Sequence, residues 1–260
     1  MHIVTFTRST PDTTAKVEVD GKGAVTWGDA ATVVNPWDEY SLEEAIVQAK
    51  NGGGKATVVA IGAEMHNEAL KHSIAMGLDA AVRVFDDALN VNDSLQWATV
   101  AAATVQKFGD VSLVIFGKES VDVGTDQHAY QTARKLGWTM LSYVSKILAI
   151  DTATKTIKVE KVLEGGKQVV TAQLPAVVSV MKGINEPRYP SFIGIRKASK
   201  AEIPVWSLGD LGVSLPAPSV EVLAYHNPPA REVTTEIIDG ASAEEKAEKL
   251  ADKLLEAKIL

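Results

Sequence analysis

The sequence predicts an α/β protein with a doubly wound, mostly parallel sheet, an antiparallel extension, and a C-terminal arm that ends in a helix. Over the first two thirds of the chain, short β-branched, apolar runs alternate with segments of helical periodicity, the pattern of βαβ units. Three later strand-like runs are joined by short turn sequences, and the end of the chain is rich in proline. These observations together predict the fold class.

The predicted parallel strands are apolar on both faces, as strands are when helices cover both sides of a sheet. They are expected at residues 2–7, 56–62, 81–85, 111–117 and 176–181. The helices between them are expected at residues 38–50, 64–76, 92–108 and 125–136. Short links between these elements favour right-handed crossovers in a single sheet.

The antiparallel extension is expected at residues 143–150, 156–163 and 168–174. The segments 151–154 and 164–167 between these runs are good turn sequences. Because the run at 176–181 follows them, we expect the extension to be inserted before the last core strand.

The tail differs from the rest of the chain. Prolines interrupt every period between residues 207 and 231, which predicts an extended arm. A final helix is expected with Ser242 as N-cap and Glu245 completing a capping box. Its narrow apolar stripe consists of Ala247, Leu250, Leu254 and Ala257. The stripe can pack on its own domain or on a partner subunit. We expect residues 1–206 to form a nucleotide-binding α/β domain, and residues 207–260 to pack on a partner.

The composition excludes several function classes. The chain has 260 residues, a formal net charge of −7 and no cysteine. Disulfides, thiolate metal centres and cysteine nucleophiles are therefore excluded, and redox chemistry needs a bound cofactor. The acidic balance argues against nucleic acid as a ligand. No apolar run approaches the roughly 18 residues that span a bilayer, and the chain starts in a strand-like run without a basic leader. We expect a cytoplasmic protein without membrane insertion.

Side chains that could carry catalysis are not grouped in any known motif. The first strand is not followed by G-x-G-x-x-G, the sequence has neither a Walker loop nor G-x-S-x-G, and the five histidines lack metal-ligand spacing. His66 and His72 share a predicted helix but point to different faces, so both are expected at the solvated surface. The sequence predicts no catalytic residue and no metal site.

Three segments near the carboxyl ends of predicted strands favour a nucleotide, since open α/β sheets bind ligands there. Residues 7–12 follow the first strand, and residues 35–40 place Pro36 at a helix start. Residues 117–127 leave a strand at Gly117 and begin a helix whose free N–H groups could hold a phosphate. Each segment could instead cap a helix without a ligand. Because all three segments are expected at one sheet edge, a bound nucleotide is favoured over three unrelated helix caps.

The segment 183–198 mixes prolines with apolar residues and is followed by basic ones. It could be an ordinary crossover whose aromatic side chains pack in the core. It could also be a surface loop with an apolar anchor and a basic rim, which is typical of a docking hot spot.

Four segments resemble the β subunit of electron transfer flavoproteins: residues 35–45, 75–79, 174–178 and, above all, the N-E-P-R-Y-P-S run at 185–191. The resemblance spans nearly the whole chain. It implies a Rossmann-like domain of the adenine nucleotide alpha hydrolase type, paired with an α subunit that carries the redox FAD. The β subunit usually holds a structural AMP, and in electron-bifurcating members a second FAD.

The resemblance places the nucleotide contacts on the three segments described above and on the end of the second parallel strand. The residues are Thr5, Asn35, Pro36, Trp37, Asp38, Ile61, Gly117, Lys118, Ser120, Asp122, Val123, Gly124, Thr125 and Gln127. Family members usually follow the glutamine with a small residue and a glycine, whereas here His128-Ala129-Tyr130 follows Gln127. The loop lacks the full acidic, glycine and threonine pattern of bifurcating relatives, so AMP is favoured over a second FAD.

The resemblance also implies that residues 183–200 form a docking loop for flavoprotein dehydrogenases such as acyl-CoA dehydrogenases. Its predicted contact residues are Glu186, Tyr189, Phe192, Ile193, Arg196, Lys197 and Lys200. Phe192 stands where a leucine is common, which suggests a different partner pocket.

The leading hypothesis is therefore an electron-carrier subunit, not itself an enzyme, that shuttles electrons from flavoprotein dehydrogenases to an acceptor. The alternative is a stand-alone adenine-nucleotide-binding stress or regulatory protein of the same broad fold. That alternative leaves Phe192 and the arm without a role. A nucleotide-dependent ligase or hydrolase is disfavoured because the first turn lacks a glycine-rich pyrophosphate motif.

Overall fold

The structure is a computed structural model that describes residues 1–230 and 235–259. Residues 231–234 and 260, which fall in the predicted arm and at the end of the chain, lie outside the described residues. The chain divides into two units, Met1–Tyr225 and His226–Leu260.

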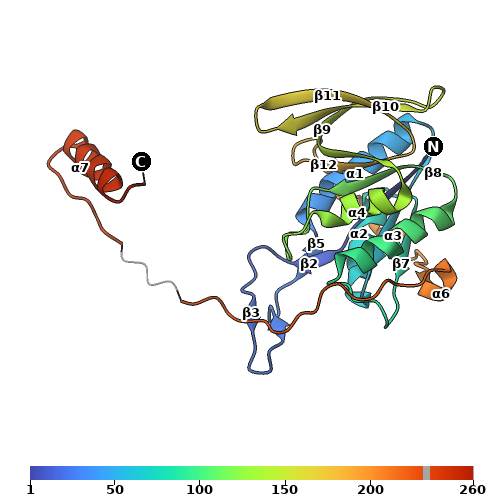
Figure 1. Ribbon diagram of the computed structural model, residues 1–260, viewed down its shortest axis with the longest axis horizontal. Helices are drawn as coiled ribbons and strands as arrows, with labels where there is room; N and C mark the ends of the chain where they lie inside the picture. Colours follow the sequence, from blue (N-terminus) through green and yellow to red (C-terminus); the bar gives the residue numbers. More distant parts are fainter. Residues whose placement is uncertain (231–234, 260) are drawn as a thin grey trace. The chain divides into compact units, whose positions relative to one another are not determined.

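A nine-stranded sheet forms the centre of the first unit, in the order β11-β10-β9-β12-β8-β1-β6-β7-β13 (Figure 1). Every neighbouring pair from β9 to β13 is parallel. The strands of this parallel part are β1 (His2–Phe6), β6 (Lys55–Ile61), β7 (Ala80–Val84), β8 (Val111–Gly117), β9 (Thr139–Asp151), β12 (Ala176–Val180) and β13 (Val205–Trp206). The predicted core strands and the doubly wound class are confirmed.

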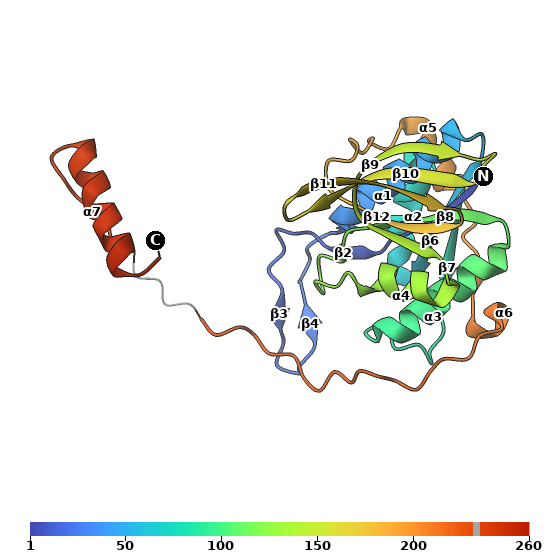
Figure 2. The ribbon, with the colours of Figure 1, turned by 45° about the horizontal axis from the view of Figure 1, so that its top comes forward.

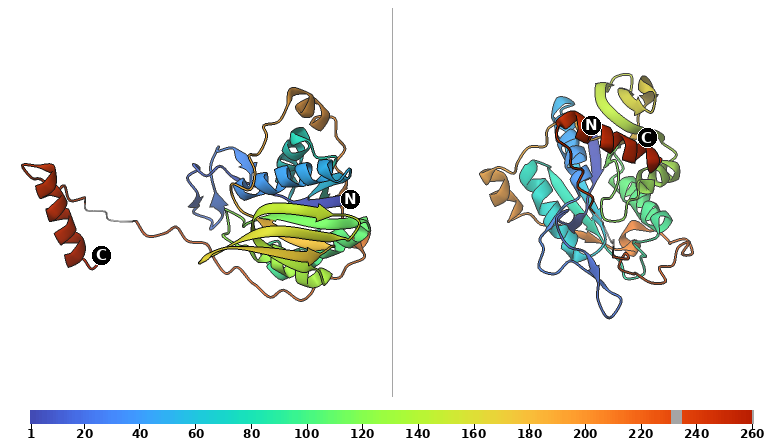
Figure 3. Two further views of the ribbon diagram at one scale, coloured as in Figure 1. Left: turned by 90° about the horizontal axis from the view of Figure 1, so that it is seen from above. Right: turned by 90° about the vertical axis from the view of Figure 1, so that its left-hand side faces the viewer.

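Helices cover both faces of the sheet, and alternate strand residues supply the two cores (Figures 2 and 3). One face packs against α1 (Pro36–Asn51) and α2 (Asn67–Met76) through residues such as Ile3, Val58 and Leu113. The other packs against α3 (Ser94–Phe108) and α4 (Gln127–Leu136) through residues such as Val4 and Val59. Because successive residues point to opposite faces, strands buried on both sides must be apolar throughout.

The predicted antiparallel extension is present at one edge of the sheet. β10 (Thr156–Leu163) pairs antiparallel with both β9 and β11 (Gly166–Gln173). β9 begins at Thr139, earlier than expected, because its first residues pair in parallel with β12 before the strand continues beside β10. One strand thus joins the parallel core to the extension.

Several short elements were not predicted because each is too short to show a period. β2 (Ser9–Pro11) pairs with β5 (Thr32–Val34), and β3 (Glu18–Val19) pairs with β4 (Val25–Thr26). A 3-10 turn, η1 (Glu64–His66), precedes α2 where a continuous helix was expected. The helix α5 (Phe192–Ala198) lies in the predicted docking loop, and α6 (Leu208–Leu211) follows β13.

Residues 207–225, expected to begin an extended arm, are held to the first unit by hydrogen bonds. Ser219 donates its N–H and its hydroxyl to Asp93, and Gln96 donates to the carbonyl of Pro216. The boundary between the units therefore lies after Tyr225.

The second unit contains α7 (Ala243–Glu256). Ser242 caps this helix by accepting from the N–H of Glu245 at 3.2 Å, as expected. In the predicted capping box, the Glu245 side chain would accept from the N–H of Ser242. It accepts instead from the N–H of Ala241, at 2.8 Å. Across the described residues, we find no helix with the length and apolar character needed to cross a membrane.

Candidate functional site

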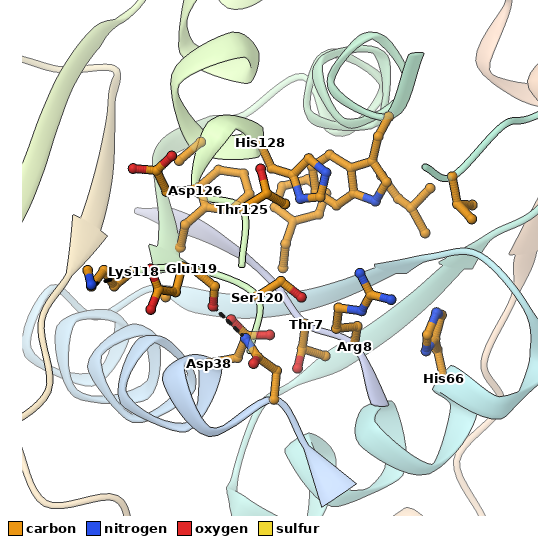
Figure 4. Close-up of a pocket in the computed structure, with 18 residues that line it drawn as sticks. Thr7, Arg8, Asp38, His66, Lys118, Glu119, Ser120, Thr125, Asp126 and His128 are labelled. Atoms are coloured by element: carbon orange, nitrogen blue, oxygen red, sulfur yellow. Dashed lines mark hydrogen bonds and ion pairs between the residues drawn. The ribbon is translucent and has the colours of Figure 1, made fainter. Parts of the chain in front are cut away.

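A pocket lies at the carboxyl ends of β1, β6 and β8, in the middle of the sheet (Figure 4). It is the sheet edge where all three predicted nucleotide segments were expected to meet. The lining residues are Phe6, Thr7, Arg8, Asn35, Asp38, Ile61, His66, Val91, Trp97, Phe116, Gly117, Lys118, Glu119, Ser120, Thr125, Asp126, His128 and Ala129.

Asn35 fastens the start of α1 to the loop after β8. Its side-chain amide donates to the carbonyl of Glu119 at 2.9 Å, and its Oδ1 accepts from the N–H of Val121 at 3.1 Å. Although it occupies the N-cap position, its side chain makes no cap hydrogen bond. Asn35 therefore holds two of the predicted nucleotide segments together.

Gly117 allows α1 to approach the end of β8 closely. A Cβ at this position would lie 2.6 Å from Asp38 Oδ1 and 2.7 Å from the carbonyl oxygen of Trp37. Since real Cβ atoms do not approach other atoms so closely, only glycine fits here. The strand-ending glycine thus shapes one wall of the pocket.

The loop between β8 and α4 forms a closed turn with the helix start at its end. Ser120 N–H donates to the carbonyl of Thr125 at 3.0 Å, and Gly124 N–H donates to the carbonyl of Ser120 at 2.8 Å. Asp126 occupies the N-cap position of α4 but makes no side-chain cap bond. Because N–H groups of a first helical turn have no partner within the helix, this end of the pocket suits an anion.

Arg8 crosses the mouth of the pocket to the same loop. Its guanidinium lies 2.8 Å from Asp122 Oδ2, and Asp122 also accepts a short hydrogen bond from the Ser120 hydroxyl. The Nε of Arg8 is buried and has no partner among the described residues. A buried donor without a partner is a point where a ligand oxygen can bind.

Asp38 lies buried at the base of the pocket. Burial raises the pKa of this carboxyl to about 7, against the opposing effects of a hydrogen bond from Asn35 and the charge of Arg8. Near neutral pH it therefore exists in both protonation states. It can accept a hydrogen bond from a ligand in one state and donate in the other.

Aromatic rings form the apolar wall of the pocket. Phe6 and Phe116 stack with their centroids 4.9 Å apart, and Trp97 and His128 stack at 4.2 Å. Burial lowers the pKa of His128 to about 4, so its ring is neutral at pH 7. The cavity that these rings help to line measures about 60 Å³.

The expectation that His66 is a solvated surface residue is wrong. Its side chain is 7% exposed and lies in the pocket beside Arg8 (Figure 4). The reason is the η1 turn, which replaces the first part of the predicted helix and brings His66 to the carboxyl end of β6. Burial, with the charges of Arg8 and Arg83 adding to it, lowers the pKa of His66 to about 4. His72 is only half-buried.

The predicted nucleotide residues fall into two groups. Those that line the pocket are Asn35, Asp38, Ile61, Gly117, Lys118, Ser120 and Thr125. Those outside its lining are Thr5, Pro36, Trp37, Asp122, Val123, Gly124 and Gln127. Several of the second group connect elements instead: Thr5 donates to Ser41, and Gln127 accepts from Ser94.

Sequence reasoning did not assign the aromatic rings of Phe6, Trp97 or Phe116 to the pocket. A signal was available for Phe6 and Phe116, since each stands at the end of a strand that leads into a predicted ligand loop. Trp97 comes from the first turns of α3, far from any strand end. Only the packing of α3 beside α4 brings it to His128.

The predicted docking loop, residues 183–200, is fixed to α1 by polar contacts. Arg188 Nε and its second guanidinium nitrogen donate to the two oxygens of Glu43 at 2.8 and 2.7 Å. Asn185 donates to Glu44 and to the carbonyl of Tyr40. Because a bidentate arginine–carboxylate pair fixes orientation, the loop has a defined position on the domain.

The apolar residues of this loop are exposed. Tyr189 and Phe192 are each 94% exposed, and Ile193 is 84% exposed. α5 starts at Phe192 and packs on α2 at Gly194, where a Cβ would lie 2.1 Å from the carbonyl oxygen of Ala75. The helix thus presents Phe192 and Ile193 to solvent while its other side is held close to the domain. The remaining predicted docking residues, Glu186, Arg196, Lys197 and Lys200, are also exposed.

Comparison with known proteins gives a family match. A family model described as "Electron transfer flavoprotein domain" matches residues 24–211, which include the start of α1, the loop after β8 and the predicted docking loop.

Individual relatives extend the similarity to the whole chain. "Caffeyl-CoA reductase-Etf complex subunit CarD" of Acetobacterium woodii is 33% identical, with all of both chains covered. "Electron transfer flavoprotein subunit beta" of Clostridium acetobutylicum is 33% identical over 82% of this chain and 81% of its own. "Protein FixA" of Azotobacter vinelandii is 31% identical over 88% of this chain and 81% of its own.

Proposed function

This chain belongs to the electron transfer flavoprotein family, in the role of a β subunit, and we propose that it pairs with an α subunit that carries FAD. In the complex it would pass electrons from flavoprotein dehydrogenases to an acceptor, as a carrier subunit and not as an enzyme. Full-length similarity to subunits of electron-transfer complexes is the observation that supports this proposal. We propose a cytoplasmic location for the complex.

The pocket offers groups that suit the phosphate of an adenine nucleotide. The first turn of α4 provides N–H donors beyond that of Gln127, which donates to Thr125 Oγ1 at 3.3 Å, and Arg8 Nε is a buried donor without a partner among the described residues. Asp38 and Asn35 approach from the start of α1. When bound, the nucleotide would supply no redox chemistry. These residues would hold it as a structural element that joins the three loops.

Size favours AMP over a second FAD in this subunit. A cavity of about 60 Å³ is far smaller than the roughly 300–1,000 Å³ of pockets that enclose a ligand. A nucleotide must therefore lie partly in the open mouth, or displace the Trp97–His128 stack. Both requirements are harder to meet for the larger dinucleotide.

The docking loop supports the proposal of a flavoprotein partner. An apolar anchor that is almost fully exposed has no role in the folded subunit alone, whereas burial in a partner's pocket would release its hydration water. The basic residues Arg196, Lys197 and Lys200 lie close by in sequence, and they would attract an acidic partner surface.

The test is co-purification with the product of the neighbouring gene, followed by acid extraction and identification of the released nucleotides. FAD together with AMP supports the proposal. Two FAD molecules per complex would place the protein among the bifurcating carriers. ATP, or no nucleotide and no partner, would favour the stand-alone nucleotide-binding protein and overturn the proposal.

A further inference from the structure

His66 lies against the carboxyl end of β6, in a position that depends on a glycine. A Cβ at residue 62 would lie 2.9 Å from His66 Nε2 and 3.0 Å from its Cδ2. Gly62 also has a φ of +135°, which side-chain-bearing residues rarely adopt. The ring therefore reaches the pocket because residue 62 leaves space for it.

A hydrogen bond from Ser9 determines which ring nitrogen of His66 carries the proton. The N–H of Ser9 donates to Nδ1 at 3.1 Å, so Nδ1 is the unprotonated acceptor. The neutral ring then carries its proton on Nε2. A second bond, from the Ser9 hydroxyl to the carbonyl of Met65 at 2.9 Å, holds the same turn. The orientation of the ring is thus fixed by two contacts with β2.

His66 is 7% exposed and lines the pocket, and among the described residues its ring makes a hydrogen bond through Nδ1 but none through Nε2–H. Its charged neighbours are each held by one contact, since Arg8 pairs with Asp122 and Arg83 donates to the carbonyl of Gly62 at 3.1 Å, while the Nε of each arginine has no partner among the described residues. Such a neutral donor in an aromatic pocket suits an uncharged acceptor, for example the ring nitrogen of a base.

The strand order places this donor away from the phosphate end of the pocket. The start of α4, where Asp126 makes no cap bond, follows β8, whereas His66 follows β6, and β1 lies between these two strands. Adjacent strands are about 4.8 Å apart, so the two ends are separated by roughly 10 Å. The ribose of a nucleoside monophosphate separates its phosphate from its base in the same way.

On the basis of the proposed nucleotide site, we infer that His66 is a specificity-determining residue whose Nε2–H donates to a ring nitrogen of a bound purine. The phosphate of the same ligand lies at the start of α4. A ring carbon at that position of the base cannot accept this hydrogen bond. The pocket therefore discriminates between purines that differ in a single ring atom.

The test compares AMP with its 1-deaza, 3-deaza and 7-deaza analogues by calorimetric titration of the complete complex after its exchangeable nucleotide has been removed. His66→Asn keeps an acceptor for the Ser9 N–H but lacks the Nε2–H. We expect this variant to bind AMP about three- to tenfold more weakly, the effect of one neutral hydrogen bond. One deaza analogue should bind the wild type more weakly by the same factor, and should bind the variant as well as AMP does. His72→Asn, on the α2 helix that follows η1 and outside the pocket lining, is the control and should bind like the wild type.

Nitrogen NMR of the ring-labelled histidines gives a readout that needs no nucleotide. His66 should show a protonated Nε2 and an unprotonated Nδ1. The opposite tautomer, or AMP binding that is unchanged in His66→Asn, would overturn the role of His66 and leave the nucleotide site in place. Failure of the wild-type complex to bind AMP would overturn the nucleotide site and, with it, base recognition by His66.

Discussion

At the residue scale, the molecule combines contacts made within one turn of a helix, such as the cap at Ser242, with contacts between separate elements, such as the stack of Trp97 on His128. Pro36 at a helix start and Ser242 as an N-cap follow from backbone rules that act within one turn, and both are found. His66 was misplaced because a 3-10 turn and a helix have similar sequence patterns, yet they direct a side chain differently. The Trp97–His128 stack joins two helices whose packing no local pattern specifies.

The pH dependence of stability tests the burial of His128. Its pKa is about 6.5 in the unfolded chain and about 4 in the folded one, so the unfolded chain binds a proton first as the pH falls. Stability is therefore complete above pH 6.5 and is lost as the pH falls toward 4. The loss between pH 7.5 and 5.0 should be about 2 kcal/mol from this residue alone.

His128→Phe keeps a ring against Trp97 and removes the titrating group. We expect the difference in unfolding free energy between pH 7.5 and 5.0, measured with urea, to shrink by that amount. His66 and Asp38 titrate in both proteins and cancel in the comparison. An identical pH difference in the two proteins would show that His128 is accessible to protons.

At the element scale, the exposure of the docking loop distinguishes between two interpretations that the sequence left open. A crossover packed on the core would bury Tyr189 and Phe192, but both are almost fully exposed. Sequence could not decide this, because apolar residues beside prolines occur in both situations. The deciding features are the Glu43–Arg188 pair and the contact at Gly194, which hold the loop by other residues.

Phe192→Ala should weaken binding to the donor dehydrogenase by about 2 kcal/mol, mainly through faster dissociation, because a desolvated anchor is lost. Neutralising Arg196 and Lys197 should instead slow association, more so at low salt. Surface plasmon resonance separates the two rates. Val169→Ala, an exposed apolar residue on β11, is the matched control. Wild-type electron transfer at subsaturating donor by the Phe192 variant would contradict the anchor.

At the scale of the whole molecule, the sheet was predictable because its strands are apolar on both faces and alternate with periodic helices. The boundary after Tyr225 could not be predicted. Residues 207–225 contain the prolines expected of an arm, and yet they form hydrogen bonds with α3 and its flanking loop. A high proline content indicates that a segment lacks regular secondary structure, but it does not indicate whether the segment packs on the domain.

The last prediction concerns assembly. In α7 the apolar residues Leu250 and Leu255 are 47% and 59% exposed, and within this unit no helical residue is buried. An amphipathic helix gains most of its stability from packing its apolar face, so α7 should require a surface outside its own unit.

We expect deletion of residues 240–260 to weaken the heterodimer with the flavin-bearing subunit. Sedimentation velocity over a range of concentrations would show dissociation at higher concentration than for the wild type. Asp252→Ala, on the polar side of the helix, should leave the assembly unchanged. A truncated chain that sediments as a stable, unaltered heterodimer would mean that the C-terminal helix contributes nothing to the interface.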